Sequence, residues 1–256
     1  MILAVDIGNT NIVVGLIENE EILFTERLST NHLKTEMEYA NDLRTIFEIC
    51  DIKKEQIEGG IIASVVPQIT GIMKLAIEKL FRFKPLVVGP GIKTGINIRL
   101  DNPSEMGSDR VADAVAATTE YSAPIIIVDM GTANTISIID KGKNVIGGLL
   151  MPGVLVSLDA LTAAASQLNG ISIEKPKDII GKNTRDCMKS GVIYGQASMI
   201  DGLIDRIEKR IGEKATVIVT GGLSKMIVPH CEHEVIHDEN LLLKGLNIIY
   251  DMNKKA

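Results

Sequence analysis

The sequence has few cysteines, no tryptophan and no long apolar run. Its 256 residues hold three cysteines, Cys50, Cys187 and Cys231, an odd number at wide spacing that suits a reducing compartment and not a disulfide framework. No apolar run reaches the ~18 residues expected of a membrane span, and the first residues lack the pattern of a secretory signal. A net charge of −6 without blocks of like charge argues against a nucleic-acid partner. We therefore expect a soluble cytoplasmic protein, with neither nucleic acid nor membrane as partner.

An internal repeat is the strongest pattern that is present. Residues 2–17, ILAVDIGNTNIVVGLI, align without a gap with residues 125–140, IIIVDMGTANTISIID. In both copies an apolar strand ends in Asp-x-Gly, turns through small polar residues and returns as a second β-rich run. One such hairpin could be an ordinary turn. Two at corresponding places, with Asp6 matching Asp129, indicate a duplicated unit that begins with a β-hairpin.

The remainder of each half alternates between strand-like and helix-like segments. Periodicity predicts helices over 34–49, 68–81, 107–121, 154–166, 183–211 and 240–252, and strands over 60–66, 84–88 and 215–219. A third strand is expected after each hairpin. The pattern indicates an α/β protein of two halves, 1–122 and 123–256, each with a mixed sheet covered by helices, and Pro124 lies near the boundary.

A third glycine turn, Gly221-Gly222, follows the predicted strand 215–219. Alone it could be a plain connection between a strand and a helix. Glycine turns, however, let backbone N–H groups approach a phosphate, and nearby carboxylates can hold the cations that neutralise it. Three such turns after three strands, two of them with an aspartate, together suggest a nucleoside triphosphate bound between two lobes.

These motifs resemble those of the type III pantothenate kinases, within the superfamily of actin and the sugar kinases. The resemblance covers essentially the whole chain and rests on DIGNTN at 6–11, GSDR at 107–110, DMGTANT at 129–135, GGLLMPG at 147–153, GKNTRDCMKSG at 181–191 and TGG at 220–222. It implies duplicated actin-like (ribonuclease H-like) halves, each with a mixed five-stranded sheet, and an ATP cleft between them. The first half would carry the first phosphate loop and the acceptor site, and the second half the second phosphate loop and the adenosine site.

The resemblance implies phosphorylation of pantothenate by ATP to 4′-phosphopantothenate, the first step of coenzyme A biosynthesis. Asp109 would be the general base that takes the proton from the attacking hydroxyl. The substrate-binding residues would be Leu100, Gly107, Ser108, Asp109, Arg110 and Thr184. Thr184 would reach the pocket from the partner subunit of a homodimer. Leu100 departs from the family, which usually has a tyrosine there, so one hydrogen bond to the substrate is missing.

The resemblance assigns nucleotide and cation contacts to the three glycine turns. Asp6 would organise Mg²⁺, through water, and Asp129 would bind a monovalent cation, K⁺ or NH₄⁺. The ATP-binding residues would be Asp6, Ile7, Gly8, Asn9, Thr10, Asn11, Ile12, Val13, Thr132, Gly221 and Gly222.

Structural roles compete with several of these assignments. Ser108 or Asp109 could simply start a helix, where the helix dipole favours an acidic side chain. Arg110 could form an ion pair with Glu105 or Asp113. Asn183 or Thr184 could cap the long helix that follows. The segment HCEHEVIH, with His230, Cys231, His233 and His237, matches no common zinc spacing, so we expect a loop that leads into an edge strand.

Two other functions remain open at this point. The first is a nucleotide-gated regulatory or binding protein on the same fold, and the second is a kinase for another small hydroxyl acceptor. Asp109 separates a kinase from a gate, because a gate needs phosphate loops but no base that faces an acceptor. Leu100 is the position that leaves room for a different acceptor.

Overall fold

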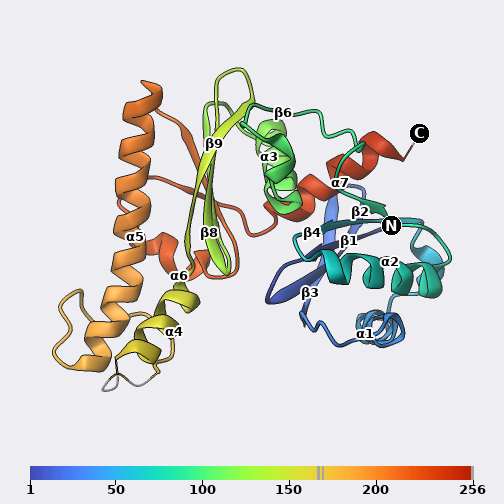
Figure 1. Cartoon of the computed structure of the whole chain (residues 1–256), viewed down its shortest axis with the longest axis horizontal. Helices are drawn as coiled ribbons and strands as arrows, with labels where there is room; N and C mark the ends of the chain where they lie inside the picture. The colour runs from blue at the N-terminus through green and yellow to red at the C-terminus, as the bar shows by residue number, and fades with distance from the viewer. Residues whose placement is uncertain (166–167, 169, 255–256) are drawn as a thin grey trace. The chain divides into compact units, whose positions relative to one another are not determined.

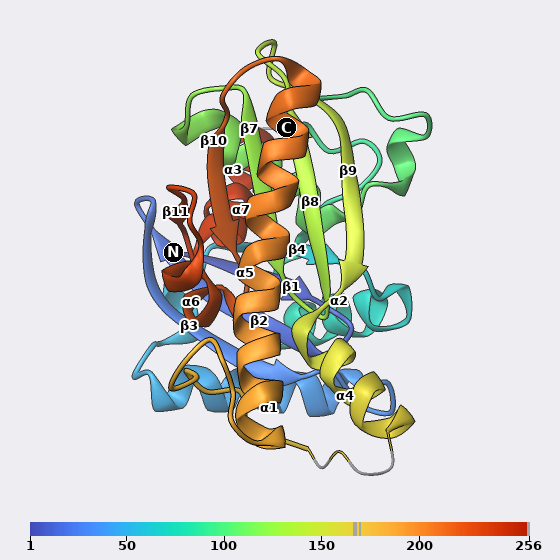
Figure 2. The ribbon, with the colours of Figure 1, turned by 90° about the vertical axis from the view of Figure 1, so that its left-hand side faces the viewer.

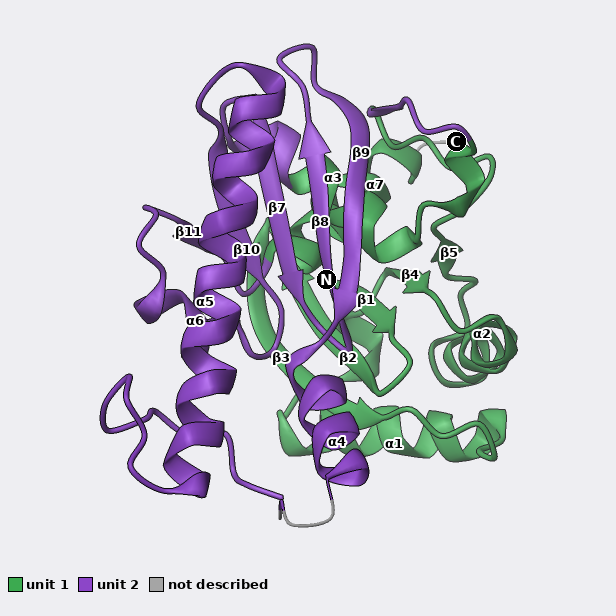
Figure 3. Ribbon diagram, turned by 60° about the vertical axis from the view of Figure 1, so that its left-hand side comes forward, with its two compact units in different colours: residues 1–95, 102–116, 241–256 green, residues 96–101, 117–240 purple. Residues whose placement is uncertain are grey.

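The computed structural model of the chain contains two compact units, coloured separately in Figure 3. Unit 1 comprises residues 1–95, 102–116 and 241–256, and unit 2 comprises residues 96–101 and 117–240. The structure describes residues 1–165, 168 and 170–254. Each unit is built on one mixed β-sheet.

Unit 1 has a five-stranded sheet in the order β3-β2-β1-β4-β5. Its strands are β1 (Ile2–Ile7), β2 (Asn11–Glu18), β3 (Glu21–Ser29), β4 (Gly59–Ser64) and β5 (Leu86–Val87). The first three strands form an antiparallel meander, whereas β4 is parallel to β1 and β5 is parallel to β4. The carboxyl ends of β1 and β4 therefore meet at one edge of the sheet, with Ile7 paired to Ser64.

Helices α1 (Glu36–Ile49) and α2 (Pro67–Phe81) lie side by side in unit 1 (Figure 1). Their apolar faces, which include Leu43 and Met73, pack with Leu3 and Val5 of β1 in one buried cluster. Helix α7 (Leu241–Asn253) packs against β1 and β4. The sequence sets the ends of these helices: a capping box between Thr35 and Glu38 starts α1, and Pro67 occupies the first turn of α2.

Unit 2 has a six-stranded sheet in the order β11-β10-β7-β8-β9-β6. Its strands are β6 (Asn97–Ile98), β7 (Ile125–Met130), β8 (Ala133–Ile139), β9 (Asn144–Pro152), β10 (Thr216–Thr220) and β11 (Ile236–His237). The helices that lie wholly within it are α4 (Val154–Ala164), α5 (Thr184–Ile211) and the short α6 (Ser224–Ile227). The long helix α5 runs along one face of the sheet (Figure 2), where Ile193, Ile200 and Ile204 pack with side chains of β7, β8 and β10. Helix α3 (Ser108–Glu120) contributes residues to both units.

The strand orders confirm the predicted duplication. Without β6, the order β9-β8-β7-β10-β11 in unit 2 corresponds strand for strand to β3-β2-β1-β4-β5 in unit 1. Unit 2 differs from the predicted five strands because β6 adds to the sheet edge, parallel to β9, with Asn97 opposite Asn144. A two-residue strand leaves no periodic pattern in a sequence, so nothing indicated it.

The six predicted helices and three predicted strands are present, with ends shifted by a few residues. Helix α4 ends at Ala164, and residue 166 of the predicted helix 154–166 lies outside the described residues. The predicted edge strand after HCEHE is β11, which pairs with β10 at the end of the sheet. Among the described helices, none has the length and apolar character needed to cross a membrane.

Candidate functional site

The first Asp-x-Gly turn joins β1 to β2 and is braced from β3. The N–H of Gly8 donates to the carbonyl of Asn11 at 3.0 Å, and a Cβ atom at Gly8 would lie only 3.1 Å from that oxygen. The segment after β3 closes the turn from outside: Thr30 N–H donates to the Thr10 carbonyl at 3.0 Å, and Thr30 Oγ1 donates to the Gly8 carbonyl at 2.7 Å. The side chains of Asn9, Thr10 and Asn11 are exposed. The turn is therefore a rigid loop whose polar side chains can meet a ligand.

Burial separates the residues predicted around this turn into two groups. Ile7 and Ile12 are 0% exposed and belong to the apolar core of unit 1. Their side chains cannot meet a ligand, so only their backbone groups can take part in binding. Asp6 and Val13 are half-buried and face each other in the register of β1 and β2.

The Gly107–Arg110 segment is anchored at the same sheet edge as Asp6. Ser108 Oγ accepts the N–H of Ser64 at 2.7 Å and donates to the Ser64 carbonyl at 2.9 Å, which fixes the start of α3 to the end of β4. Because Ser64 pairs with Ile7, the residue after Asp6, the structure brings these two predicted site segments together. Ser108 therefore starts the helix by bonding to a strand and not by capping the helix N–H groups.

Asp109 lies in the first turn of α3 and is half-buried. Its Oδ1 accepts the backbone N–H of Arg110 at 2.7 Å. A Cβ atom at Gly107 would overlap the same Oδ1, so glycine is needed for the carboxylate to fold back over this position. The helix start and the carboxylate are thus built together, and the structural role expected of Asp109 does not exclude a catalytic one.

In unit 2 the Gly-Gly turn lies against the second Asp-x-Gly turn. Thr220 at the end of β10 pairs with Asp129 at the end of β7. The next residue, Gly221, has φ +94°, and a Cβ atom there would lie 2.5 Å from both Asp129 Oδ1 and the backbone nitrogen of Met130. Only glycine combines this backbone conformation with so close an approach. Gly222, which follows, is exposed.

The second turn also meets the start of helix α4. The N–H of Gly153 donates to the Thr132 carbonyl at 3.0 Å, and a Cβ atom at Gly153 would overlap the carbonyl oxygens of Gly131 and Thr132. Gly153 is the N-cap residue of α4, directly before its first residue, Val154. The predicted phosphate contact Thr132 therefore lies beside the N-terminus of a helix, which the sequence did not indicate. The signal that could have found it was Gly153 itself, directly after a predicted strand and directly before a predicted helix.

Thr184 lies in a different part of unit 2, at the start of α5. Asn183 Oδ1 accepts the N–H of Asp186 at 2.9 Å, so the expected capping role belongs to Asn183. The exposed Thr184 instead lines a cavity of about 420 Å³ between α4 and α5, with mostly apolar walls. Gln196, at another part of this cavity wall, accepts a hydrogen bond of 2.8 Å from Asn134 of β8. Asn134 is 1% exposed, unlike its exposed repeat counterpart Asn11, so the two copies have diverged here.

Leu100 is half-buried and follows the edge strand β6. This strand is tied to β9 by a hydrogen bond of 2.8 Å from Asn97 Nδ2 to Asn144 Oδ1 and one of 2.8 Å from Arg99 N–H to the Val145 carbonyl. Asn144 is in turn bonded to the carboxylate of Asp140. The backbone N–H of Asn144 lowers the pKa of Asp140 below its usual 3.8, against an opposing effect of burial. The position of the segment around Leu100 thus depends on a polar network at the sheet edge.

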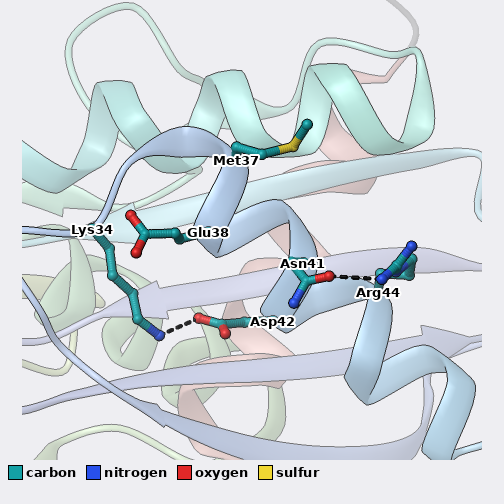
Figure 4. Close-up of a pocket in the computed structure, with 6 residues that line it drawn as sticks. All are labelled: Lys34, Met37, Glu38, Asn41, Asp42 and Arg44. Carbon is teal, nitrogen blue, oxygen red and sulfur yellow. Dashed lines mark hydrogen bonds and ion pairs between the residues drawn. The ribbon is translucent and has the colours of Figure 1, made fainter.

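A second hollow, of about 490 Å³, lies on the outer side of α1 and the residues before it (Figure 4). Its walls come from one stretch of chain, where Lys34 Nζ pairs with Asp42 Oδ2 at 2.6 Å and Arg44 donates to Asn41 at 2.7 Å. These pairs engage Lys34, Asp42 and Arg44, and the remaining charged group, Glu38, accepts the N–H of Thr35 at 2.8 Å. It contains none of the predicted site residues, and we assign it no function.

The histidines near the C-terminus have structural partners. His233 Nε2 lies 3.0 Å from Asp205 Oδ1, and burial, followed by the charge of Asp201, raises the pKa of Cys231 to about 11. Within residues 1–165, 168 and 170–254, no three histidine, cysteine or acidic side chains are grouped as metal ligands would be.

Comparisons with known proteins place these features in one family. Residues 2–206 match the family model described as Type III pantothenate kinase. A protein of that name from Exiguobacterium sp. is 42% identical over 255 residues, which is 100% of each chain. Another, from Halalkalibacterium halodurans, is 43% identical over 253 residues, covering 99% of this chain and 100% of the relative.

Solved structures of low sequence identity share the fold. An activator of 2-hydroxyisocaproyl-CoA dehydratase from Clostridium difficile, with bound ADPNP, has a TM-score of 0.53 at 12% identity, and the match covers 99% of this chain and 97% of that one. An inorganic polyphosphate/ATP-glucomannokinase from Arthrobacter sp. has a TM-score of 0.50 at 12% identity, covering 100% and 99%. These matches confirm the predicted actin-like α/β fold. With full-length relatives above 40% identity and a family model that spans most of its length, the chain belongs to the type III pantothenate kinase family.

Proposed function

We propose that this protein phosphorylates the primary hydroxyl of pantothenate with ATP, giving 4′-phosphopantothenate and ADP in the first step of coenzyme A biosynthesis. The observation that carries the proposal is the full-length identity to relatives named type III pantothenate kinase. The structure supports it by anchoring the Gly107–Arg110 segment at the sheet edge where Asp6 also lies.

In the proposed reaction Asp109 is the general base. The hydroxyl oxygen of pantothenate forms a bond to the γ-phosphorus, the bond from that phosphorus to the β–γ bridging oxygen breaks, and the hydroxyl proton passes to the Asp109 carboxylate. Arg110 would stabilise the charge of the transferred group, because its guanidinium keeps its charge and offers five donors in a fixed fork. Gly107, Ser108 and Leu100 would contact the acceptor.

The glycine turns would bind the nucleotide. We assign Asp6 and the residues up to Val13 to the triphosphate, and Thr132 to a second phosphate contact. The N-terminus of α4 favours an anion at Thr132, because Gly153 has no side chain with which to cap the first N–H groups of the helix. The Gly221–Gly222 turn would meet the adenosine.

Two cations complete the proposed site. The carboxylates of Asp6 and Asp129 are hard oxygen donors, which suit Mg²⁺ at Asp6 and K⁺ or NH₄⁺ at Asp129. Asp129 Oδ1 lies 2.5 Å from the position that a Cβ atom of Gly221 would occupy, so this carboxylate is next to the Gly221–Gly222 turn. When bound, the cations neutralise the phosphate charge that the protein alone does not balance.

We also propose a homodimer in which α4 and α5 lie at the interface. Leu155, Leu161 and Ile180 expose 51%, 46% and 71% of their surface, and a partner subunit would cover them. Thr184, on the same part of unit 2, would then reach the acceptor pocket of the partner.

The substitution Asp109→Asn tests the reaction. It keeps the side-chain volume and an oxygen for the Arg110 N–H but removes the proton acceptor, so turnover of labelled ATP with pantothenate should fall by roughly 10²- to 10⁴-fold. ATP binding should be retained. Asp109→Ala should be at least as damaging, and Glu105→Gln, an exposed carboxylate of the preceding segment, should change nothing.

The outcomes separate the candidate functions. If both Asp109 variants phosphorylated pantothenate at the rate of the parent protein, Asp109 would be only a helix-start residue. ATP binding by the parent protein without turnover would favour the nucleotide-gated regulatory protein. The parent protein should also be assayed with a panel of hydroxyl acceptors. Phosphorylation of another acceptor in preference to pantothenate would favour the alternative kinase that Leu100 allows.

A further inference from the structure

Ser224 and His237 lie behind the Gly221–Gly222 turn and have no role in the site described above. Ser224 opens α6 and is 0% exposed. Its Oγ lies 2.6 Å from the Gly221 carbonyl, and its backbone N–H donates to the same carbonyl at 3.2 Å. His237, on the edge strand β11, places Nε2 2.7 Å from Ser224 Oγ. The three groups form one chain of hydrogen bonds that ends at the turn.

The direction of these hydrogen bonds follows from the donors available. A carbonyl oxygen can only accept, so the single hydroxyl proton of Ser224 is donated to Gly221. The contact between His237 and Ser224 therefore requires His237 Nε2 to carry a proton and donate it. Glu239 Oε1 lies 3.9 Å from the same nitrogen, which is too far for a hydrogen bond.

A serine–histidine pair also suggests a hydrolytic nucleophile, but this pair is built differently. In a catalytic triad the acidic residue orients the histidine through Nδ1, whereas Glu239 lies on the side of Nε2. Ser224 is fully buried, so its oxygen cannot attack a substrate. The pair can act only through the backbone that Ser224 holds.

The Gly221 carbonyl and the Gly222 N–H belong to one planar peptide group and point in opposite directions. A carbonyl held towards Ser224 therefore directs the Gly222 N–H away from Ser224, at a residue that is exposed. On its other side the turn has little space, because a Cβ atom at Gly221 would lie 2.5 Å from Asp129 Oδ1 and from the nitrogen of Met130. The orientation of this one peptide group is thus set from both sides.

We propose that His237 is a positioning residue for the nucleotide: through Ser224 it orients the Gly221–Gly222 peptide so that the Gly222 N–H faces the bound nucleoside. The inference rests on the proposed function, in which this turn meets the adenosine. It also gives a role to the last histidine of the HCEHEVIH segment.

The substitution His237→Leu removes the donor at similar volume, and His237→Gln restores an N–H close to the position of Nε2. For His237→Leu we expect the Kd of a fluorescent ATP analogue and the KM for ATP to rise roughly 2- to 10-fold, the effect of one neutral hydrogen bond. The kcat and the KM for pantothenate should stay unchanged, and His237→Gln should bind like the parent protein. The matched control is His233→Leu, because His233 lies in the same segment but bonds to Asp205 and should leave ATP binding unaltered.

Ser224→Ala gives an independent test that keeps His237. It should weaken nucleotide binding as much as His237→Leu, and the double variant should be no weaker than either, because both remove one chain of hydrogen bonds. A fall in kcat together with a similar rise in the KM values for both substrates would show a general structural role and overturn the inference. Failure of His237→Gln to bind ATP like the parent protein would overturn it as well. If His237→Leu and Ser224→Ala bound the ATP analogue as tightly as the parent protein, the role of His237 would be overturned and the proposed function would stand. A parent protein that binds no ATP analogue would overturn the proposed function as well.

Discussion

Substitution of Gly221 by alanine should damage both the stability and the nucleotide site of the protein. Substitution of Gly212 is a matched control for the backbone conformation. Both glycines are in unit 2 and both have a left-handed backbone, with φ of +94° at Gly221 and +82° at Gly212. A Cβ atom at Gly212, which ends α5, would meet nothing within 4 Å. At Gly221 it would lie 2.5 Å from Asp129 Oδ1 and from the backbone of Met130. The pair separates backbone strain from steric overlap.

The two costs can be worked out separately. An alanine in the left-handed region costs about 1–2 kcal/mol, which is the whole effect expected of Gly212→Ala. Gly221→Ala adds the cost of overpacking against a backbone that cannot move aside, about 1–3 kcal/mol, for a total of roughly 2–5 kcal/mol. If the turn moves to relieve the overlap, its displacement reaches the proposed adenosine site. We then expect the KM for ATP to rise at least about tenfold, since small displacements of positioning groups are costly.

Urea unfolding followed by circular dichroism measures the first quantity, and initial rates at varied ATP measure the second. Gly212→Ala should lose stability without a change in the KM for ATP, whereas Gly221→Ala should lose more stability and bind ATP poorly. Equal stability in the two variants together with an unchanged KM for ATP would refute the close approach of Gly221 to Asp129.

Three further predictions concern the cations, the assembly and the sheet edge. Activity should require Mg²⁺ and a monovalent cation, so full activity in a sodium-only buffer free of potassium and ammonium would contradict the site at Asp129. Leu161→Glu should convert the dimer into a monomer, as measured by light scattering. The free energy of unfolding should change little, because Leu161 is 46% exposed in the single chain. A parent protein that is monomeric and active at nanomolar concentration would exclude the dimer. The lowered pKa of Asp140 means that its contribution to stability is complete above about pH 3.8 and is lost as the pH falls through the folded-state value. Asp140→Asn should therefore lose stability at neutral pH and show a weaker dependence on pH below 4 in acid titration.

Local patterns in the sequence were enough to predict the duplicated hairpins, the main helices and the fold class. A strand such as β1 and a helix such as α5 carry their periodicity within themselves, and Asn183 and Gly212 mark the two ends of α5. Contacts between distant segments were not predictable in the same way. The strand β6 exists because Asn144 and Val145 offer it partners 47 or so positions away. The approach of Gly221 to Asp129 and the bond from His237 to Ser224 are likewise set by the pairing of β10 with its neighbours.

The predicted site residues show the same division. Ser108 and Asp109 were identified from a local motif, but the bond that fixes them comes from Ser64, 44 residues earlier. Ile7 and Ile12 illustrate the opposite case, in which a motif contains residues whose side chains serve the core. A motif therefore marks a segment of chain, whereas the neighbours in the sheet decide which atoms of that segment can meet a ligand.

The two Asp-x-Gly turns share a topology but are braced in different ways, and one exchange accounts for the difference. Asn11 pairs with Ser29 and Asn134 pairs with Met151, so Thr30 of the first copy corresponds to Pro152 of the second. Proline has no N–H, so the bond that Thr30 makes to its turn cannot be repeated.

In the second copy the following residue, Gly153, makes the closing bond instead, to Thr132. This bond draws the chain so close to the turn that only glycine fits at position 153. Helix α4 starts at the next residue, whereas in the first copy a loop separates β3 from the start of α1 at Glu36. Duplication thus supplied two turns of one shape. In the second copy the closing bond therefore lies directly before the N-terminus of α4, a place that favours a phosphate.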